Sequence, residues 1–570
     1  MVGKLREMDN AVTQLKVEDE EFLVASLIDR CPKTMMLREL VQNAVEAAAN
    51  AAPGDQNITI DTVQIDGGAK LRIRNTGTGM DAAALYSMCD IASSIGKLKG
   101  LDKNFGMGAK VASLPSNNHG VRYRSCAGGR VHEVIIGKRN GVYGRILRPK
   151  RTAGPGTGYE RQTDILDVTA QAREEGLDLS RDWTEVVLLG MRPDHNTAFD
   201  PYDGDPGSEQ FWLPDYLYNR YFRIPEGIEL DISADYHWRP ETAAFHTISQ
   251  RAKDAFAHYD CVTTADGLKI HYFYDPTCAD RPWENLSSEG AIQTAIGQVA
   301  LVFRDEIYDR KIGSPWAYDA PMFGVTFGAR NTSVFIELPD AYPLRPDTYR
   351  QFLMSAAGTQ QALTTRDFAK IVRASRPAWL LGIIEDLGGS RGGTGAVIDG
   401  LAKLSHKLNL STLSGDDGPT LVVDPQNSTT AEDALGFDIV LLRNEQDIND
   451  RWLRGRAACF YQETMQLFVN TQYTSVNALK SDLQKKFEAS TETPELLEII
   501  KEVAIDCLVT RVGRALIFAI SKHLQVDDWQ YGHVEKAMSP EALSIAGDDC
   551  EMLQSWAEQQ VQARLALGAA

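Results

Sequence analysis

The chain has 570 residues, of which 43% are hydrophobic, 24% charged and 8% aromatic. These proportions are those of an ordinary globular protein and exclude a disordered or fibrous one. The net charge of −19 argues against nucleic-acid binding through bulk charge, so that such binding would need a local basic patch.

The chain is long enough for about three or four domains of ~150 residues each. Its eight cysteines are scattered without a C-x-x-C pair, which favours reduced thiols over a zinc site or a disulfide framework. No apolar segment follows a basic start, and the longest apolar runs are too short to span a bilayer. We therefore expect a cytoplasmic protein without a membrane segment.

Helical and strand patterns alternate from the start of the chain. Residues 20–50 carry two helical patterns, the second of which is ended by AAPGD. Apolar residues then alternate over 57–75 around Gly67-Gly68, which predicts a β-hairpin. Residues 82–92 again have a helical pattern.

A strand-rich stretch follows a segment rich in glycine and lysine. Residues 121–149 predict a meander of strands with turns at Gly128-Gly129 and Asn140-Gly141, and residues 182–191 predict one more strand. The order of helix, strands, helix, glycine loop and strands predicts an α+β sandwich over residues 1–200, with helices on one face of a single sheet.

The rest of the chain divides into three regions. Residues 201–385 predict a mixed α/β domain with a helical stretch near 362–381. Glycine-rich and polar segments over 386–435 predict a linker and loops. Helical patterns dominate 436–570, which we expect to be a mainly helical C-terminal domain. The strands expected in the second region are GIELDIS, LKIHYFY, QVALVFRDEIYD and TSVFIELP.

Three polar residues share one face of the helix expected before Asn50. Glu39, Asn43 and Glu46 are spaced i, i+4 and i+7. A solvated helix face is one interpretation of this pattern. Two glycine elements follow downstream, NTGTGM and NFGMGAKVAS. Each is open to two interpretations, a tight turn or a place where backbone passes close to a ligand.

The order LRELVQNAVEA, NTGTGM and FGMGAK resembles the three nucleotide-binding boxes of the GHKL (Bergerat-fold) ATPases. This superfamily contains DNA gyrase B, the heat-shock chaperone ATPases, histidine kinases and MutL. The resemblance covers residues 20–190 closely and the next two hundred more loosely. It implies a Mg²⁺-dependent ATP site and slow ATP hydrolysis.

The resemblance assigns roles to residues of all three boxes. Glu39 corresponds to the general base that polarises the attacking water, and Asn43 to the Mg²⁺ ligand, for which an amide oxygen is suited. Thr184 corresponds to the strand threonine that helps hold the adenine, although Trp183 stands where glycine usually precedes it. The glycines assigned to the adenine side are Gly77 and Gly79, and those assigned to the phosphates are Gly106 and Gly108. The other residues expected to line the nucleotide are Glu46, Ala47, Met80, Met107, Ala109 and Lys110.

Two further positions bear on the nucleotide. Lys97 or Lys99, in the stretch that corresponds to a flexible lid, is a candidate to close over the phosphates, with a solvated lysine as the alternative. Asn75 replaces the aspartate with which the family accepts a hydrogen bond from the adenine amino group. The amide oxygen of Asn75 can still accept that bond, but the negative charge is lost. Relaxed base choice and a non-hydrolysing site remain alternatives.

The downstream region looks like the transducer domain of the clamp-forming branch. WLPDYLYNRYFRIPEGIEL, GQVALVFRDEIYD and TSVFIELPDAYPLRPDTYRQFL look most like MORC-type ATPases and phage rIIA-like proteins. In that branch a basic residue of the second domain reaches the γ-phosphate. Arg345 and Arg350 are the candidates, because the arginine fork pairs with phosphate oxygens; a surface arginine is the alternative for either.

Two functions are carried forward. The first is an ATP-dependent conformational switch, a nucleotide-gated homodimeric clamp whose C-terminal helices dock an unknown protein partner. The second is a structural or interaction protein with a vestigial nucleotide site. A sensor kinase is rejected because no histidine precedes His119, and a topoisomerase because the C-terminal region is too short for a further cleavage domain.

The stretch GKRNGVYGRILRPKR is a candidate contact for a polyanion such as DNA, with ordinary strand and turn charges as the alternative. Its basic residues are Lys138, Arg139, Arg145, Arg148, Lys150 and Arg151.

Overall fold

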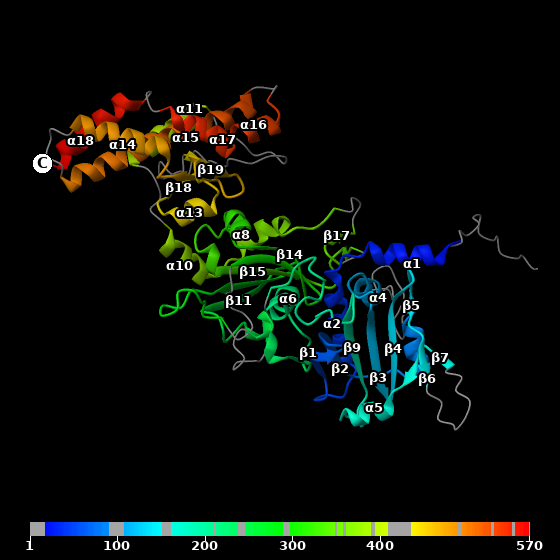
Figure 1. Cartoon of the computed structure of the whole chain (residues 1–570). Coiled ribbons are helices and arrows are strands. Elements are labelled where there is room, and N and C mark those ends of the chain that lie inside the picture. Colours follow the sequence, from blue (N-terminus) through cyan, green and yellow to red (C-terminus); the bar gives the residue numbers. More distant parts are fainter. Residues whose placement is uncertain are drawn as a thin grey trace, which may run out of the picture.

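A computed structural model shows an α+β protein in which three units follow one another along the chain (Figure 1). The residues that it describes are 18–90, 108–150, 161–209, 211–237, 245–288, 297–347, 350–356, 361–388, 394–408, 435–487, 493–525, 529–549 and 553–568. Within these residues, no helix combines the length and the apolar character needed to cross a bilayer.

The first unit is built on an eight-stranded sheet. Its strands lie in the order β10 (Glu229–Ile232), β1 (Asn57–Ile65), β2 (Gly68–Thr76), β9 (Trp183–Gly190), β3 (Gly120–Ala127), β4 (Arg130–Arg139) and β5 (Val142–Arg145), with β8 (Leu166–Asp167) beside β4. β10 runs parallel to β1. The chain therefore returns to this sheet from the region that the sequence analysis assigned to the second domain.

The hairpin predicted between β1 and β2 is confirmed, but its turn lies one residue earlier than expected. Asp66 and Gly67, with φ of 52° and 81°, form a two-residue turn, whose backbone twist matches that of the strands. Gly68 already pairs with Ile65 in the ladder. The turns predicted at Gly128-Gly129 and Asn140-Gly141 are confirmed, since each joins adjacent antiparallel strands.

Helices cover one face of this sheet, and a short helix, α5 (Thr169–Glu174), packs on the other face, where its Ala172 shares a buried cluster with Cys126 and Val131. The expectation that helices lie on one face only is therefore wrong. α2 packs on β1 and β2, and its apolar residues share one buried cluster with those strands. The helix predicted over 82–92 ends at Met88 among the described residues, where the ammonium of Lys110 donates to the carbonyl oxygens of Met88 and Asp90. The helices of the unit are α1 (Glu20–Asp29), α2 (Met35–Ala48), α3 (Ala82–Met88), α4 (Gly108–Ser113) and α5 (Thr169–Glu174).

The second unit contains a five-stranded sheet. The stretch QVALVFRDEIYD, expected as one strand, is a hairpin, because Arg304 and Asp305 adopt φ of 49° and 67° and reverse the chain. The strand order is β11 (His258–Thr263), β12 (Lys269–Tyr274), β15 (Thr332–Leu338), β13 (Gln298–Phe303) and β14 (Glu306–Ile312). The helices are α6 (Trp212–Arg220), α7 (Ile248–Arg251), α8 (Ser314–Asp319), α9 (Ala369–Ala374) and α10 (Ala378–Leu387). α9 lies within the predicted helical stretch, whereas α10 begins in it and continues beyond residue 381.

The third unit is mainly helical, as expected, but it is built around a small sheet that was not predicted, and part of the region expected to be linker is a helix. The region predicted as linker contains α11 (Gly395–Lys407), and the C-terminal region contains a three-stranded sheet. These strands are short and almost wholly buried, so their sequences lack the polar alternation that marks a half-exposed strand. The sheet order is β18 (Asp438–Leu442), β20 (Gln466–Asn470) and β19 (Ala458–Tyr461). The other helices are α13 (Glu445–Asp450), α14 (Thr474–Phe487), α15 (Pro494–Gln525), α16 (Tyr531–Ala537), α17 (Pro540–Asp548) and α18 (Gln554–Gly568).

Two two-stranded sheets complete the described β-structure. They pair β6 (Arg148–Lys150) with β7 (Arg161–Thr163) and β16 (Leu344–Pro346) with β17 (Leu353–Ser355). The units are joined by packing. One buried cluster contains residues of α2 together with Ile307 and Phe335 of the second sheet. Arg330 of the second unit makes a forked ion pair with Asp450 of the third, with Nη2 and Oδ1 2.6 Å apart.

Candidate functional site

The helix face predicted from sequence lies on α2, with a different exposure for each residue. Glu39 is 9% exposed, whereas Asn43 is exposed and Glu46 half-buried. The neighbouring apolar residues of α2 fix the helix on the sheet. The face therefore carries a buried carboxylate about one turn before an exposed amide.

The first glycine element packs against α2 and β3 at backbone distance. A Cβ on Gly77 would lie 2.1 Å from the carbonyl oxygen of Ala47, and Gly77 has a φ of 124° that favours glycine. A Cβ on Gly79 would lie 1.7 Å from the carbonyl oxygen of Cys126. Any side chain at either position would push the loop away from α2 or β3, so both glycines are required by contact.

The second glycine element meets the same helix. A Cβ on Gly108 would lie 1.8 Å from Oε2 of Glu39. The structure thus brings together parts of all three sequence elements, with Glu39 and Ala47 on α2 in contact with Gly108 and Gly77. Ala109 follows Gly108 in α4 and is half-buried. The remaining predicted residues of this segment, Lys97, Gly106 and Met107, lie outside the described residues, as does Lys99.

A cluster of neutral polar groups lies where β2, β9 and β3 meet. Asn75 stands opposite Thr184 in the β2–β9 ladder. The hydroxyls of Thr184 and Ser125 are 2.8 Å apart, and Ser125 Oγ accepts a hydrogen bond from the N–H of Met80. The Asn75 Nδ2 group donates to the carbonyl of Thr76 at 2.8 Å. Sequence reasoning missed Ser125, which only the register of β3 against β9 places beside Thr184.

The side chain of Lys110 reaches the end of α3. Its ammonium donates to carbonyl groups at the end of α3, and burial lowers its pKa to about 8.

The two arginines expected to reach the γ-phosphate have different surroundings. Arg345 lies in the strand β16. Arg350 follows this strand, and its backbone carbonyl accepts a hydrogen bond from Nη2 of Arg220 at 3.1 Å.

A buried ion cluster beside Glu39 was not predicted from sequence. Arg38 is 2% exposed and donates to Glu39 and, through two of its nitrogens, to Glu306 at the start of β14. Arg220 of α6 donates to the same Glu306 carboxylate. Burial tends to raise the pKa of Glu306, but Arg220 and Arg38 outweigh it and lower the pKa to about 2. Two cations and two carboxylates therefore meet where the first two units touch.

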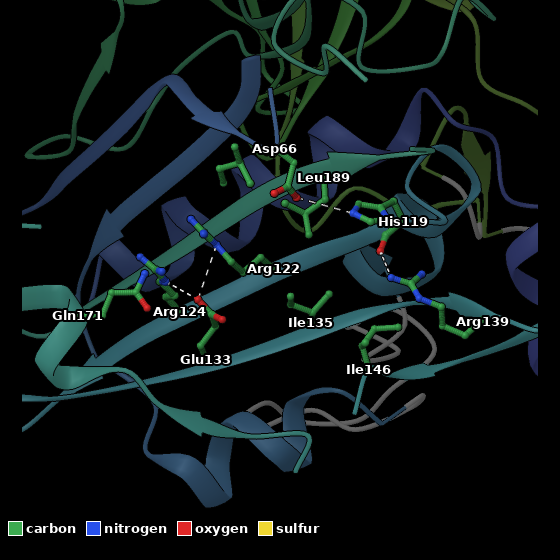
Figure 2. Close-up of a pocket in the computed structure, with 11 residues that line it drawn as sticks. Asp66, His119, Arg122, Arg124, Glu133, Ile135, Arg139, Ile146, Gln171 and Leu189 are labelled. Atoms are coloured by element: carbon green, nitrogen blue, oxygen red, sulfur yellow. Dashed lines mark hydrogen bonds and ion pairs between the residues drawn. The ribbon is translucent and has the colours of Figure 1, made fainter. Parts of the chain in front are cut away.

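The opposite face of the sheet has a different chemistry. A hollow of about 230 Å³ is lined there by charges of both signs, and Figure 2 shows Arg122 and Arg124 directed at Glu133. Val121 and Tyr123, which alternate with these arginines along β3, belong to the core that includes α2. The hollow is thus separated from the α2 site by the sheet.

The basic stretch that begins in β4 is partly neutralised by its surroundings. Arg145 pairs with Asp90 and Asp164, and Arg148 pairs with Glu133. Arg139 donates to the carbonyl groups of Asn118 and His119. Lys138 lies over the ring of Tyr143. Arg151 and the side chain of Lys150 lie outside the described residues.

One group of residues has the spacing of metal ligands. Ligand atoms of His195, Asp200 and Asp203 lie within 4.8 Å of one another. His195 Nδ1 accepts a hydrogen bond from the N–H of Met191, and Nε2 donates to the carbonyl of Asp200. Both ring nitrogens of His195 therefore make hydrogen bonds to the backbone of the turn. We interpret the cluster as a hydrogen-bonded turn and not as a metal site.

No protein-family model matches the chain, and a search of curated proteins found no match. The function is therefore inferred from the residues of the site and their contacts.

We predict that Gly79→Ala destabilises the first unit by about 1–3 kcal/mol, because its methyl group must displace the backbone of β3. Gly144→Ala is the matched control, since a Cβ there meets nothing within 4 Å. Urea unfolding followed by circular dichroism measures both. Equal unfolding midpoints for the two variants would contradict the close approach.

We predict that Glu306→Gln lowers the free energy of unfolding at pH 7 by about 3 kcal/mol, because it removes the carboxylate that pairs with Arg220 and leaves the buried Arg38 with Glu39 alone. The folded-state pKa of Glu306, about 2, lies below its ordinary value of 4.5. Its stabilising effect is therefore complete above about pH 4.5 and fades as pH falls toward 2. Urea unfolding between pH 3 and 7 should show a deficit that shrinks with acidity. Glu174→Gln, at an exposed position, serves as the control and should show no such trend.

Proposed function

We propose that this chain is a GHKL-type ATPase that binds ATP with Mg²⁺ and hydrolyses it slowly. In this proposal the first unit is the Bergerat-fold nucleotide domain, the second is a transducer-like domain and the third a mainly helical C-terminal region. The observation that carries the proposal is the convergence of both glycine elements on α2, with Gly108 beside Glu39 and Gly77 beside Ala47. The neutral polar cluster at Asn75 and Thr184 supports it from the other end of the helix.

The proposed pocket runs along α2 from a charged end to a neutral end. The exposed amide of Asn43 would hold Mg²⁺, which withdraws charge from the phosphates when bound. The backbone at Gly108 would face the phosphates, and the loop at Gly77 would admit the adenine. Asn75 donates its amide hydrogen to Thr76, so its oxygen is the atom left to accept a bond from the base.

Glu39 would act as the general base. Its carboxylate takes a proton from water as the water oxygen bonds to the γ-phosphorus, and the bond from that phosphorus to the bridging oxygen of ADP breaks. Oε2 of Glu39 is the oxygen beside Gly108. Products are ADP and inorganic phosphate, with the proton released to solvent.

ATP binding would switch the conformation of a homodimeric clamp, with an arginine of the second unit reaching the γ-phosphate. Arg350 is the better placed of the two candidates, because its backbone is bonded to Arg220 and so to the cluster at Glu39. The C-terminal helices would dock a protein partner. A vestigial, non-hydrolysing site is the competing proposal.

We predict that Glu39→Gln lowers ATP turnover at least about 100-fold, because the amide cannot accept the proton. The affinity for Mg-ATP should change little. Steady-state phosphate release and calorimetry measure the two quantities, with Glu174→Gln as the control at an exposed helical position. Equal and negligible turnover in wild type and variant would favour the vestigial site, and absence of Mg-ATP binding would overturn the whole proposal.

We predict that Asn75→Asp preserves or tightens ATP binding, because a carboxylate accepts a stronger bond from the adenine amino group. Asn477→Asp, on α14, makes the same charge change far along the chain and serves as the control. Calorimetric titration with ATP and with GTP measures affinity and base choice together. A loss of ATP affinity confined to Asn75→Asp would show that the pocket contacts the base differently.

A further inference from the structure

Arg38 joins the second unit to the candidate catalytic carboxylate. Its Nε donates to Oε2 of Glu306 at 2.9 Å and its Nη2 to Oε1 of the same group, whereas its Nη1 donates to Oε1 of Glu39. Glu306 therefore accepts hydrogen bonds from two nitrogens of the Arg38 guanidinium, and Glu39 accepts a hydrogen bond from the third. All three side chains are almost entirely buried, so water does not compete for these bonds.

The two carboxylate oxygens of Glu39 consequently have different neighbours. Oε1 is engaged by Arg38, whereas Oε2 lies against Gly108. An arginine that turns both arms toward one carboxylate forms a strong two-bond pair. Such a pair would withdraw both oxygens of Glu39 from proton transfer, and the present arrangement leaves Oε2 outside it.

Glu306 belongs to the tip of a hairpin of the second sheet. The turn at Arg304 and Asp305 precedes it, and the carbonyl of Asp305 accepts a hydrogen bond from the N–H of Phe222 at 2.8 Å. Arg220 gives Glu306 a second cation. The position of this carboxylate is thus set by how the β13–β14 hairpin seats against α2 and α6.

We propose that Glu306 is a positioning residue of the second unit that holds Arg38 away from a two-armed pair with Glu39. The seating of the hairpin then sets how readily Glu39 accepts a proton, which couples the second unit to hydrolysis. This inference rests on the proposed ATPase function. The alternative is a purely structural role, in which the four charges stabilise the junction by pairing and Glu306 has no effect on proton transfer to Glu39.

Two double variants with the same net charge separate these explanations. Arg220→Gln with Glu306→Gln leaves Arg38 and Glu39 as the remaining pair, so Arg38 should close on Glu39. Arg38→Gln with Glu306→Gln removes the group through which Glu306 acts and leaves Glu39 without that cation. We expect turnover of the first double variant to be at least about tenfold below that of the second, with Mg-ATP dissociation constants within about twofold.

The measurements are single-turnover hydrolysis and calorimetric Mg-ATP binding on the full chain, with circular dichroism to confirm folding. Equal turnover in the two folded double variants would overturn the inference, because charge balance alone predicts that result. Should the Arg220→Gln double variant not fold, Glu306→Gln alone replaces it, and its slow turnover should be relieved by adding Arg38→Gln. Failure of that relief would also overturn the inference.

The experiment distinguishes failure of this inference from failure of the proposed ATPase function. If wild type neither binds nor hydrolyses ATP, the ATPase proposal itself falls. If wild type hydrolyses ATP through Glu39 and the two double variants have equal turnover, only the proposed role of Glu306 is refuted.

Discussion

The junction of the first two units depends on a cluster of four charges, in which each arginine pairs with at least one carboxylate and three of the side chains are buried. Arg38 and Arg220 face Glu39 and Glu306 with little access to water. Removing charged groups from water costs several kcal/mol each, and good geometry with every partner present is needed to offset it. The apolar cluster around them runs without interruption from α2 to Ile307, so the two units share one core at this point.

The glycine elements impose a second constraint of a different kind. Gly77, Gly79 and Gly108 are needed because backbone or carboxylate atoms occupy the space of their missing side chains. These contacts fix the loop before α3 and the start of α4 against α2. Because interiors are packed to high density, such contacts leave no room for a gradual adjustment. The same positions thus determine both the stability of the loop and the shape of the candidate pocket.

Local patterns in the sequence were enough to predict the helix carrying Glu39, the hairpin after it and the meander around Gly128. Each of these elements depends on residues within a few positions of one another. The partner of Arg38 could not be found in this way, because Glu306 lies 268 residues further along the chain. Ser125 was missed for a related reason, since its role depends on strand register across the sheet. The small C-terminal sheet was missed because its strands are buried on both faces and resemble short apolar helix segments.

The alternation of side chains along β2 places two chemistries on opposite faces of one strand. Asn75 faces the α2 side with neutral hydroxyl neighbours, whereas Arg72 and Arg74 face the other side, where Arg72 pairs with Asp61. Neutral donors and acceptors suit recognition of a base, whose hydrogen-bonding groups are uncharged. The carboxylate at the other end of α2 suits a water held near phosphate and Mg²⁺. On the opposite face Arg122 pairs with Glu185 and Arg124 with Glu133, so one face of the sheet carries paired charges and the other, under α2, carries neutral hydrogen-bonding groups.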